Sequence, residues 1–168
     1  GLNNSVVFAE TEPEPKEETN VPVPEGYTRY EAEDAELYDC IAKGKVEDSP
    51  ADYGHYSGLG FVGSIDNDDA TLVFTVTVGE AGSYPMNVSY AIGKGFGNAG
   101  LKIYVNDVYF QTWAFKQKNG WGEFVATTPL NSVINLSSGV NKIKLQHGYN
   151  YVEVDYIEIG PRAGADID

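Results

Sequence analysis

The sequence predicts an all-β fold, a jelly-roll β-sandwich of two antiparallel sheets, on two observations. From Tyr27 onward, aromatic and β-branched residues alternate with polar residues in short runs, and no window sustains the 3.6-residue period of an amphipathic helix. Turn residues separate these runs at short, regular intervals, which is typical of sandwiches and barrels. Only two packed sheets bury so many half-apolar strands, so we expect a sandwich with jelly-roll topology.

The expected strands follow one another along the chain with turns between them. Asn106-Asp107 separates two of them and suits a tight type I′ hairpin turn, because both residue types tolerate positive φ. Glycine-rich loops are expected at 51–60 and 93–100. The predicted strands span residues 27–32, 37–46, 61–62, 71–78, 83–91, 101–105, 108–115, 121–127, 133–136, 140–146 and 150–159.

Composition divides the chain of 168 residues into one domain and two flanking segments. Residues 1–26 hold six glutamates, one lysine and four of the eight prolines, and we expect an acidic, disordered linker there. Residues 27–160 form the predicted sandwich, and residues 161–168 form a C-terminal tail or linker. Cys40 is the single cysteine, so no intrachain disulfide forms, and we interpret it as a small core residue.

The charge of the chain excludes some partners. A net charge of -14 disfavours binding to nucleic acid or an anionic membrane surface, both of which attract lysine and arginine. No apolar run is long enough to span a membrane. Residues 6–9 would suit the end of a signal peptide, although no basic segment precedes them. We expect a monomer.

The last predicted strand carries a carboxylate with unusual surroundings. The apolar parity changes within it: Val152 and Val154 lie on one face, while Ile157 and Ile159 lie on the other. Asp155 shares the parity of the isoleucines, so we expect it to be buried and to need a neutralising partner. If the first and last strands are neighbours, Glu31 and Glu33 meet Asp155 and form a cage suited to a hard cation such as calcium.

Aromatic residues in loops are the candidate ligand contacts. Tyr53, His55 and Tyr56 lie in the first glycine-rich loop, and Phe96 and Tyr149 are weaker candidates of the same kind. Trp113 follows the alternating pattern Tyr109, Gln111, Trp113, Phe115 and so shares one face of its strand with two other rings. We therefore interpret it as a core residue.

Five pieces of the sequence, in order, resemble the family 35 carbohydrate-binding modules, which are related to family 6. The resemblance covers nearly all of residues 27–160. Its pieces are Tyr30-Glu31-Ala32-Glu33-Asp34-Ala35, Tyr56-Ser57-Gly58-Leu59-Gly60-Phe61-Val62-Gly63, Asp66-Asn67, the Trp121 strand and Val154-Asp155-Tyr156-Ile157-Glu158.

This resemblance implies a secreted, extracellular, non-catalytic jelly-roll linked to a plant cell wall hydrolase such as a mannanase. It implies a structural calcium on Glu31, Glu33 and Asp155, with backbone carbonyls from intervening loops. It also implies a sugar site in the loops at one end of the sandwich, where Trp121 and Asn150 take part. A flat ring stacks on the apolar face of a pyranose, and an asparagine amide both donates and accepts hydrogen bonds. The expected ligand is β-mannan.

Alternative ligands are uronic-acid, xylan or galactose-containing glycans. An alternative function is that of a protein-binding adhesion sandwich whose tyrosines contact a partner chain. Catalysis is disfavoured. Asp66, Asp68 and Asp69 crowd one turn rather than flanking a cleft. No nucleophile motif or zinc-ligand spacing is present.

Overall fold

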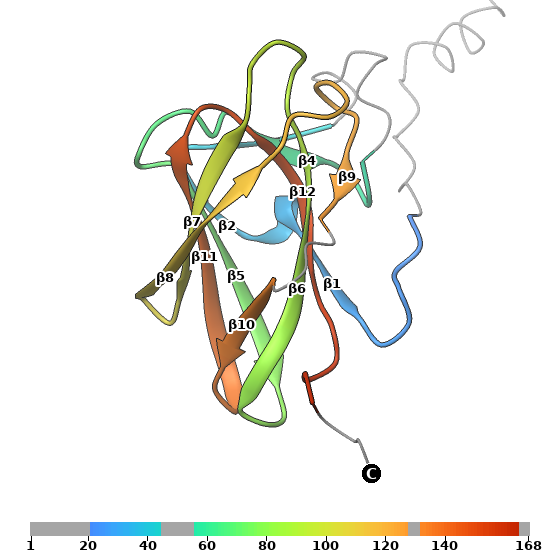
Figure 1. The fold of residues 1–168 in the computed structure, drawn as a ribbon, viewed down its shortest axis with the longest axis vertical. Coiled ribbons are helices and arrows are strands. Elements are labelled where there is room, and N and C mark those ends of the chain that lie inside the picture. The colour runs from blue at the N-terminus through green and yellow to red at the C-terminus, as the bar shows by residue number, and fades with distance from the viewer. Residues whose placement is uncertain (1–20, 45–55, 128–131, 165–168) are drawn as a thin grey trace, which may run out of the picture.

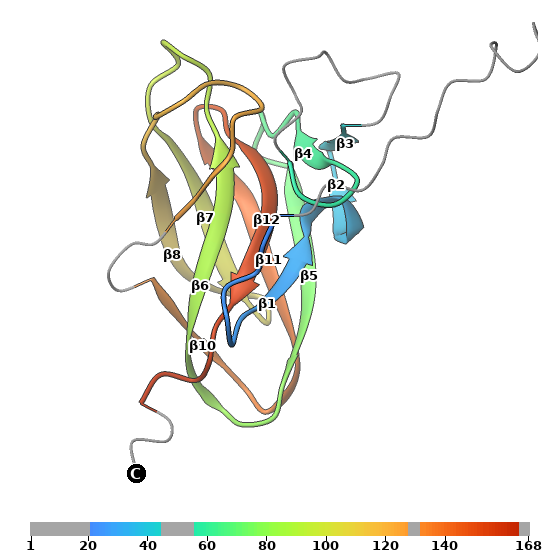
Figure 2. The same ribbon diagram turned by 90° about the vertical axis from the view of Figure 1, so that its right-hand side faces the viewer.

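A computed structural model describes residues 21–44, 56–127 and 132–164 of the chain. Twelve strands in these residues form two antiparallel sheets packed face to face, so the predicted all-β sandwich is confirmed (Figures 1 and 2). The helical structure in the described part is a single 3-10 turn, η1 (Ala32–Asp34). None of the described helical residues makes an apolar helix of membrane-spanning length.

One sheet has five strands and the other has seven. In the five-stranded sheet the order is β2 (Glu36–Tyr38), β5 (Thr71–Val78), β11 (Gly139–Tyr149), β7 (Ala99–Val105) and β8 (Val108–Phe115). In the seven-stranded sheet the order is β10 (Val133–Leu136), β6 (Gly82–Ala91), β12 (Glu153–Ile159), β4 (Phe61–Gly63) and β3 (Ile41–Lys43), with β1 (Thr28–Glu31) pairing with β12 and β9 (Val125–Ala126) pairing with β6.

Alternating residues of the two sheets fill the core between them. On β5, Leu72, Phe74 and Val76 are buried while their sequence neighbours turn outward, the period-two pattern that the sequence shows. Burying each such side chain contributes about 1.5–3 kcal/mol relative to leaving it exposed. Trp113 belongs to this core, and Cys40 packs against it, as expected.

The two ends of the domain lie side by side. β1 pairs antiparallel with β12, in a register that places Thr28 opposite Ile159 and Glu31 opposite Tyr156. This pairing confirms that the first and last strands are neighbours. The turn between β7 and β8 is also as predicted, because Asn106 and Asp107 both have positive φ, of 50° and 67°.

Several predicted strands differ from those observed. The single strand expected over 37–46 divides into β2 and β3, which belong to different sheets, and Asp39 between them has a φ of 52°. An irregular residue at that point lets the chain cross from one sheet to the other. The strand expected over 121–127 shrinks to β9, so Trp121 lies in a turn.

The last strand contains a β-bulge. Its register with β6 shifts between Val154 and Tyr156, so Asp155 is the additional residue. The bulge explains why the apolar parity changes within this stretch, since both Val154 and Ile157 are fully buried. The strand begins at Glu153 rather than at Asn150, whose φ of 55° turns the chain before it.

Loops from distant parts of the chain meet at one end of the sandwich. In Figures 1 and 2 the β6–β7 loop, the β8–β9 loop and the β11–β12 connection lie at the same end, away from the β5–β6 turn. The fold therefore brings residues near 96, 121 and 151 together.

Candidate functional site: a carboxylate cage and a ring-lined groove

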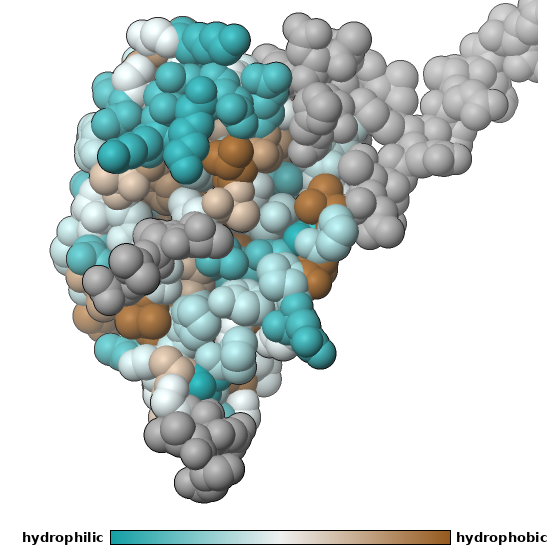
Figure 3. Space-filling view, turned by 45° about the vertical axis from the view of Figure 1, so that its right-hand side comes forward, coloured by the Kyte–Doolittle hydropathy of each residue, from teal (hydrophilic) through white to brown (hydrophobic). Residues whose placement is uncertain are grey.

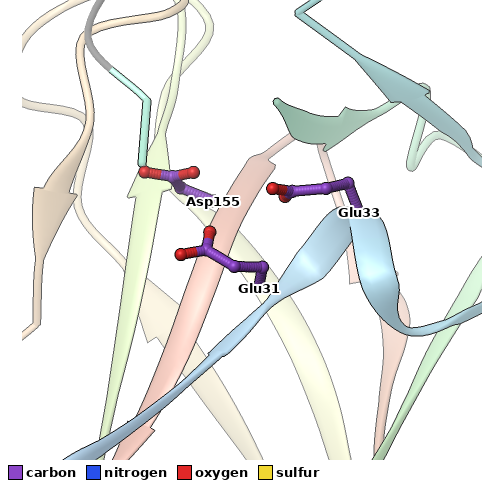
Figure 4. A group of neighbouring side chains, drawn as sticks. All are labelled: Glu31, Glu33 and Asp155. Carbon is purple, nitrogen blue, oxygen red and sulfur yellow. The ribbon is translucent and has the colours of Figure 1, made fainter. Parts of the chain in front are cut away.

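Three carboxylates converge where β1 and η1 meet β12. One oxygen from each of Glu31, Glu33 and Asp155 lies within 4.8 Å of the others. Figure 4 shows the three side chains pointing toward a common centre from β1, η1 and β12. The structure thus brings together the three residues that the sequence predicted to be neighbours.

A short loop closes over these carboxylates and donates hydrogen bonds to them. The backbone N–H of Ser57 donates to Asp155 Oδ2 at 2.8 Å, and the Ser57 hydroxyl donates to Glu31 Oε2 at 2.7 Å. The Leu59 N–H donates to Glu33 Oε2 at 3.2 Å. Gly58 has a φ of +61°, and a Cβ there would lie 2.9 Å from Glu33 Oε2, so the loop needs glycine at this position.

Burial makes the ionised form of two of these groups unfavourable. It raises the pKa of Asp155 to about 9, an effect that the nearby carboxylates of Glu31 and Glu33 increase. It raises the pKa of Glu33 to about 8, again with a contribution from Glu31. The guanidinium of Arg29, which lies close by, pairs with Glu158 at 2.7 Å and stacks on Tyr156.

The donor set fits a hard divalent cation. Glu33 Oε1 and Asp155 Oδ1 are buried and accept no hydrogen bond from any described residue. Buried oxygens of this kind need a partner. Several carboxylate oxygens without sulfur or imidazole nitrogen are the ligand type that calcium prefers.

The second part of the site is a groove among the loops at one end of the sandwich. It has a volume of about 280 Å³. Its lining combines aromatic rings with polar and charged groups: Lys43, Ser64, Ile65, Asp66, Phe96, Trp121, Tyr151, Val152 and Glu153.

Three aromatic rings form one wall of this groove. Phe96 contacts the Trp121 ring edge to face, with centroids 5.3 Å apart, and contacts the Tyr151 ring at 6.3 Å. Phe96 and Tyr151 are 51% and 46% exposed, so solvent reaches both rings. Partly exposed rings beside polar groups are the arrangement that binds the two kinds of surface on a sugar.

Backbone contacts hold Trp121 in place. A Cβ on Gly93 would lie 2.0 Å from Trp121 Nε1, so the indole packs directly on that glycine. The next residue, Gly122, has a φ of +76° and donates its N–H to Glu153 Oε1 at 2.9 Å. Burial raises the pKa of Glu153 to about 7, while this hydrogen bond and Lys43 act in the opposite direction.

Asn150 lies beside the groove but does not line it. Its amide Nδ2 donates to the carbonyl of Asn98 at 2.6 Å, and its own carbonyl lies 2.8 Å from His147 Nε2. The side chain thereby ties the β11–β12 connection to the β6–β7 loop that carries Phe96. Its predicted contact with sugar remains a prediction.

The other rings that the sequence predicts as ligand contacts differ in their burial and position. Tyr56 is completely buried, and its hydroxyl donates to the carbonyl of Gly44 at 2.6 Å. A ring without exposed surface cannot stack on a ligand, so the prediction for Tyr56 is wrong. Tyr53 and His55 lie outside the described residues. Tyr149 is exposed but packs on Gly100 instead of lining the groove.

Sequence reasoning missed Tyr151 and Glu153 as groove residues. The sequence pattern predicts that both belong to a regular final strand, and a residue inside such a strand does not face a loop. The signal that could have found them is the Asn150-Tyr151 pair directly after a strand, since Asn favours the positive φ that redirects the chain.

The face of the molecule shown in Figure 3 is mainly hydrophilic. On the face shown in Figure 3, hydrophobic residues form small separate groups rather than one broad patch. Obligate protein interfaces are larger and more apolar than that.

An all-β sandwich with a carboxylate cage between its terminal strands and a ring-lined groove among its loops defines a carbohydrate-binding module. Comparison with known proteins gives the family. Residues 28–162 match the family described as carbohydrate binding module (family 35), and the chain belongs to this family. Its members bind carbohydrate and are not catalytic.

Solved structures share the fold. A family 35 carbohydrate-binding module from Clostridium thermocellum superposes with a TM-score of 0.68 at 24% identity, over 79% of this chain and 96% of that one. A GH26-CBM35 β-(1,4)-mannanase from Podospora anserina gives 0.66 at 22% identity, over 85% of this chain and 30% of that one.

Sequence relatives are large carbohydrate-active enzymes. The chain is 34% identical over 124 residues to an exo-β-D-glucosaminidase of Amycolatopsis orientalis and 30% identical over 109 residues to an isomaltosyltransferase of Sporosarcina globispora. These matches cover 73% and 61% of the chain, but they span only 11% and 10% of the relatives' lengths.

Proposed function

We propose that this module binds a neutral polysaccharide of the plant cell wall, β-mannan first, in the groove lined by Phe96, Trp121 and Tyr151. The observation that carries the proposal is the cluster of partly exposed rings around a polar groove. Glu153 and Asp66 line the groove with one lysine, Lys43, so an anionic sugar would meet more carboxyl groups than cations.

The carboxylate cage would hold a structural calcium ion. Glu31, Glu33 and Asp155 would be its ligands, and the ion would supply the positive charge that their buried oxygens need. This role is structural, because the ion would stabilise the junction of the terminal strands.

Binding would serve a linked glycoside hydrolase. A module attached by a linker raises the effective concentration of its partner domain at the polysaccharide without taking part in bond cleavage. In this role the protein would be secreted and monomeric.

A second candidate ligand is an α-1,6-linked glucan. Two sequence relatives from Sporosarcina globispora are an isomaltosyltransferase and a 1,6-α-glucosyltransferase. This ligand is also neutral, so it suits the same groove.

Calorimetry with mannohexaose and isomaltohexaose would test the proposal and choose between the ligands. Trp121→Ala should weaken binding of the preferred sugar by about 1–3 kcal/mol, the contribution of one ring that stacks on a flat ligand. Phe110→Ala removes another exposed ring, on β8, and should leave binding unchanged. Equal affinity of the wild type and Trp121→Ala, or no binding of any neutral glycan, would contradict the proposal.

A further inference from the structure

Arg29 on β1 carries a buried guanidinium in which every N–H has an acceptor. Its Nε and Nη2 donate to Glu158 Oε2 at 3.0 and 2.7 Å. The remaining three N–H groups donate to Ser57 Oγ and to two backbone carbonyls of the chain before β1. The side chain is 6% exposed and stacks on the Tyr156 ring. A guanidinium has five N–H donors, so this one has none left for solvent or for a ligand.

This arginine holds the chain that leads into β1. We call residues 21–26 the entry segment. The carbonyl of Val21 accepts a hydrogen bond from Arg29 Nη1, and that of Pro22 accepts one from Nη2 at 2.8 Å. A turn at Gly26, whose φ is 82°, then reverses the chain into β1 (Figure 1). The described part of the predicted linker therefore lies against the sandwich.

The hydroxyl of Ser57 connects Arg29 to the carboxylate cage. It accepts from Arg29 Nη1 at 3.0 Å and donates to Glu31 Oε2 at 2.7 Å. The backbone N–H of the same residue donates to Asp155 Oδ2 at 2.8 Å. A hydroxyl has one proton to donate, so its donation to Glu31 leaves only its lone pairs for Arg29. The position of Glu31 therefore determines where Arg29 finds this acceptor.

A cation in the cage would fix this arrangement. Without an ion, Glu31, Glu33 and Asp155 bring three carboxyl groups within 4.8 Å of one another, and like charges at that distance repel. The ion would hold Glu31 and, with it, the Ser57 hydroxyl. Displacement of Ser57 would leave a buried N–H of Arg29 without an acceptor, which is costly. Arg29 would then turn toward other acceptors and release the carbonyls of the entry segment.

We propose that Ser57 and Arg29 are positioning residues that couple the carboxylate cage to the entry segment, so that calcium in the cage holds residues 21–26 against the sandwich. Calcium would thereby set the direction in which the chain enters the module. This inference rests on the proposed calcium site and adds a second role for the ion. The coupling is reciprocal, so docking of the entry segment strengthens calcium binding by the same factor.

Limited proteolysis of the full chain with a glutamate-specific protease measures release of the entry segment. The bond after Glu25 lies in this segment, whereas the bond after Glu158 lies in buried β12 and is cut only when the domain unfolds. In chelator the bond after Glu25 should be cut faster, and calcium should slow that cut about fivefold or more. Equal rates at the two bonds in chelator would overturn the inference, because the segment would then open only with the whole domain.

Calorimetric titration of the same protein with calcium distinguishes the two proposals. Calcium binding without slower cleavage after Glu25 would overturn this inference and leave the calcium site standing. Absence of calcium binding would contradict the calcium site and, with it, this inference.

Ser57→Ala breaks the connection and keeps all three carboxylates. At saturating calcium it should still bind the ion, but calcium should no longer slow cleavage after Glu25. Ser138→Ala is the matched control, because its hydroxyl donates to the carbonyl of Gly79, away from the cage. This control should behave like the wild type. Undiminished slowing in Ser57→Ala, or an equal loss in both variants, would overturn the inference.

Gly26→Ala tests the reverse direction of the coupling. Its φ of +82° is strained for alanine, while the added Cβ would meet only Pro161 at 3.7 Å, so the variant should release the entry segment. Calcium binding should then weaken severalfold. Gly164→Ala carries the same kind of strain, at a φ of +74°, with nothing within 4 Å of its added Cβ, and should leave calcium affinity unchanged. Equal calcium affinity in Gly26→Ala and Gly164→Ala would overturn the inference.

Discussion

The carboxylate cage and the ring-lined groove are built in opposite ways. The cage lies where β1 pairs with β12, the first and last strands of the domain. A loop that donates three hydrogen bonds to the carboxylates closes it. The three rings of the groove come from three different loops and remain partly exposed. This difference predicts that the cage contributes to stability and that the groove contacts the ligand. Each can therefore be perturbed separately.

Calcium removal should have the largest effect and should act on stability alone. At a calcium concentration of ~100 Kd, binding to the native state stabilises it by about 2.7 kcal/mol. For a domain of this size that corresponds to a Tm higher by roughly 5–10 °C than in the presence of a chelator. Differential scanning calorimetry measures this difference in Tm. Asp155→Asn should abolish the calcium-dependent difference, and an identical Tm with and without chelator would exclude the cage as a calcium site.

The pH dependence of the Tm provides a second test of the calcium site. In the metal-free protein the pKa values of Asp155 and Glu33 are raised to about 9 and about 8, above those of the unfolded chain. Groups with raised pKa values favour folding at low pH, and this contribution is lost as pH rises through the folded values. The Tm with chelator should therefore fall as the pH rises from about 5 to about 9. With calcium this fall should be absent, and a parallel fall in both conditions would contradict the assignment.

A methyl group at Gly93 should damage the groove without damaging the cage. A Cβ there would lie 2.0 Å from Trp121 Nε1, so Gly93→Ala should displace the indole and weaken neutral glycan binding by about 1–3 kcal/mol. Gly79→Ala is the matched control, because nothing lies within 4 Å of its added Cβ. Calorimetric affinity and the calcium-dependent Tm report the two regions. A change in the calcium-dependent Tm would show that they are not independent.

Truncating the most exposed ring of the groove should have the smallest effect. Phe96→Ala removes an edge-to-face partner of Trp121, and such pairs contribute about 0.5–1.5 kcal/mol. Glycan affinity should fall by a correspondingly small factor, with no change in Tm beyond that of a surface substitution. An effect larger than that of Trp121→Ala would identify Phe96, rather than Trp121, as the principal stacking ring.

Local patterns sufficed to predict the cage. Glu31 and Glu33 lie two residues apart at the start of the predicted domain, and Asp155 lies where the apolar residues of the last strand change faces. The parity change is the sequence signal of the bulge that the structure shows at Asp155. Pairing of the terminal strands then brings the three carboxylates together, as a jelly-roll requires.

Local patterns were less informative about the groove. Trp121 was found, but as a strand residue, and Tyr56 was assigned to a binding surface although it is completely buried. A glycine-rich loop with several rings does not specify which ring turns inward, because that depends on the cavity beneath it. Tyr56 donates its hydroxyl to the carbonyl of Gly44, which directly follows β3, and its ring packs against Phe61.

The sequence by itself determined the all-β class, most strand positions and the set of acidic residues, because strand alternation and turn chemistry act over a few residues. Tertiary structure alone decided which rings are exposed, how β2 and β3 divide between sheets, and that Tyr151 and Glu153 face a loop groove. Those features depend on contacts between residues far apart in the chain. Such contacts exist only once the two sheets have packed.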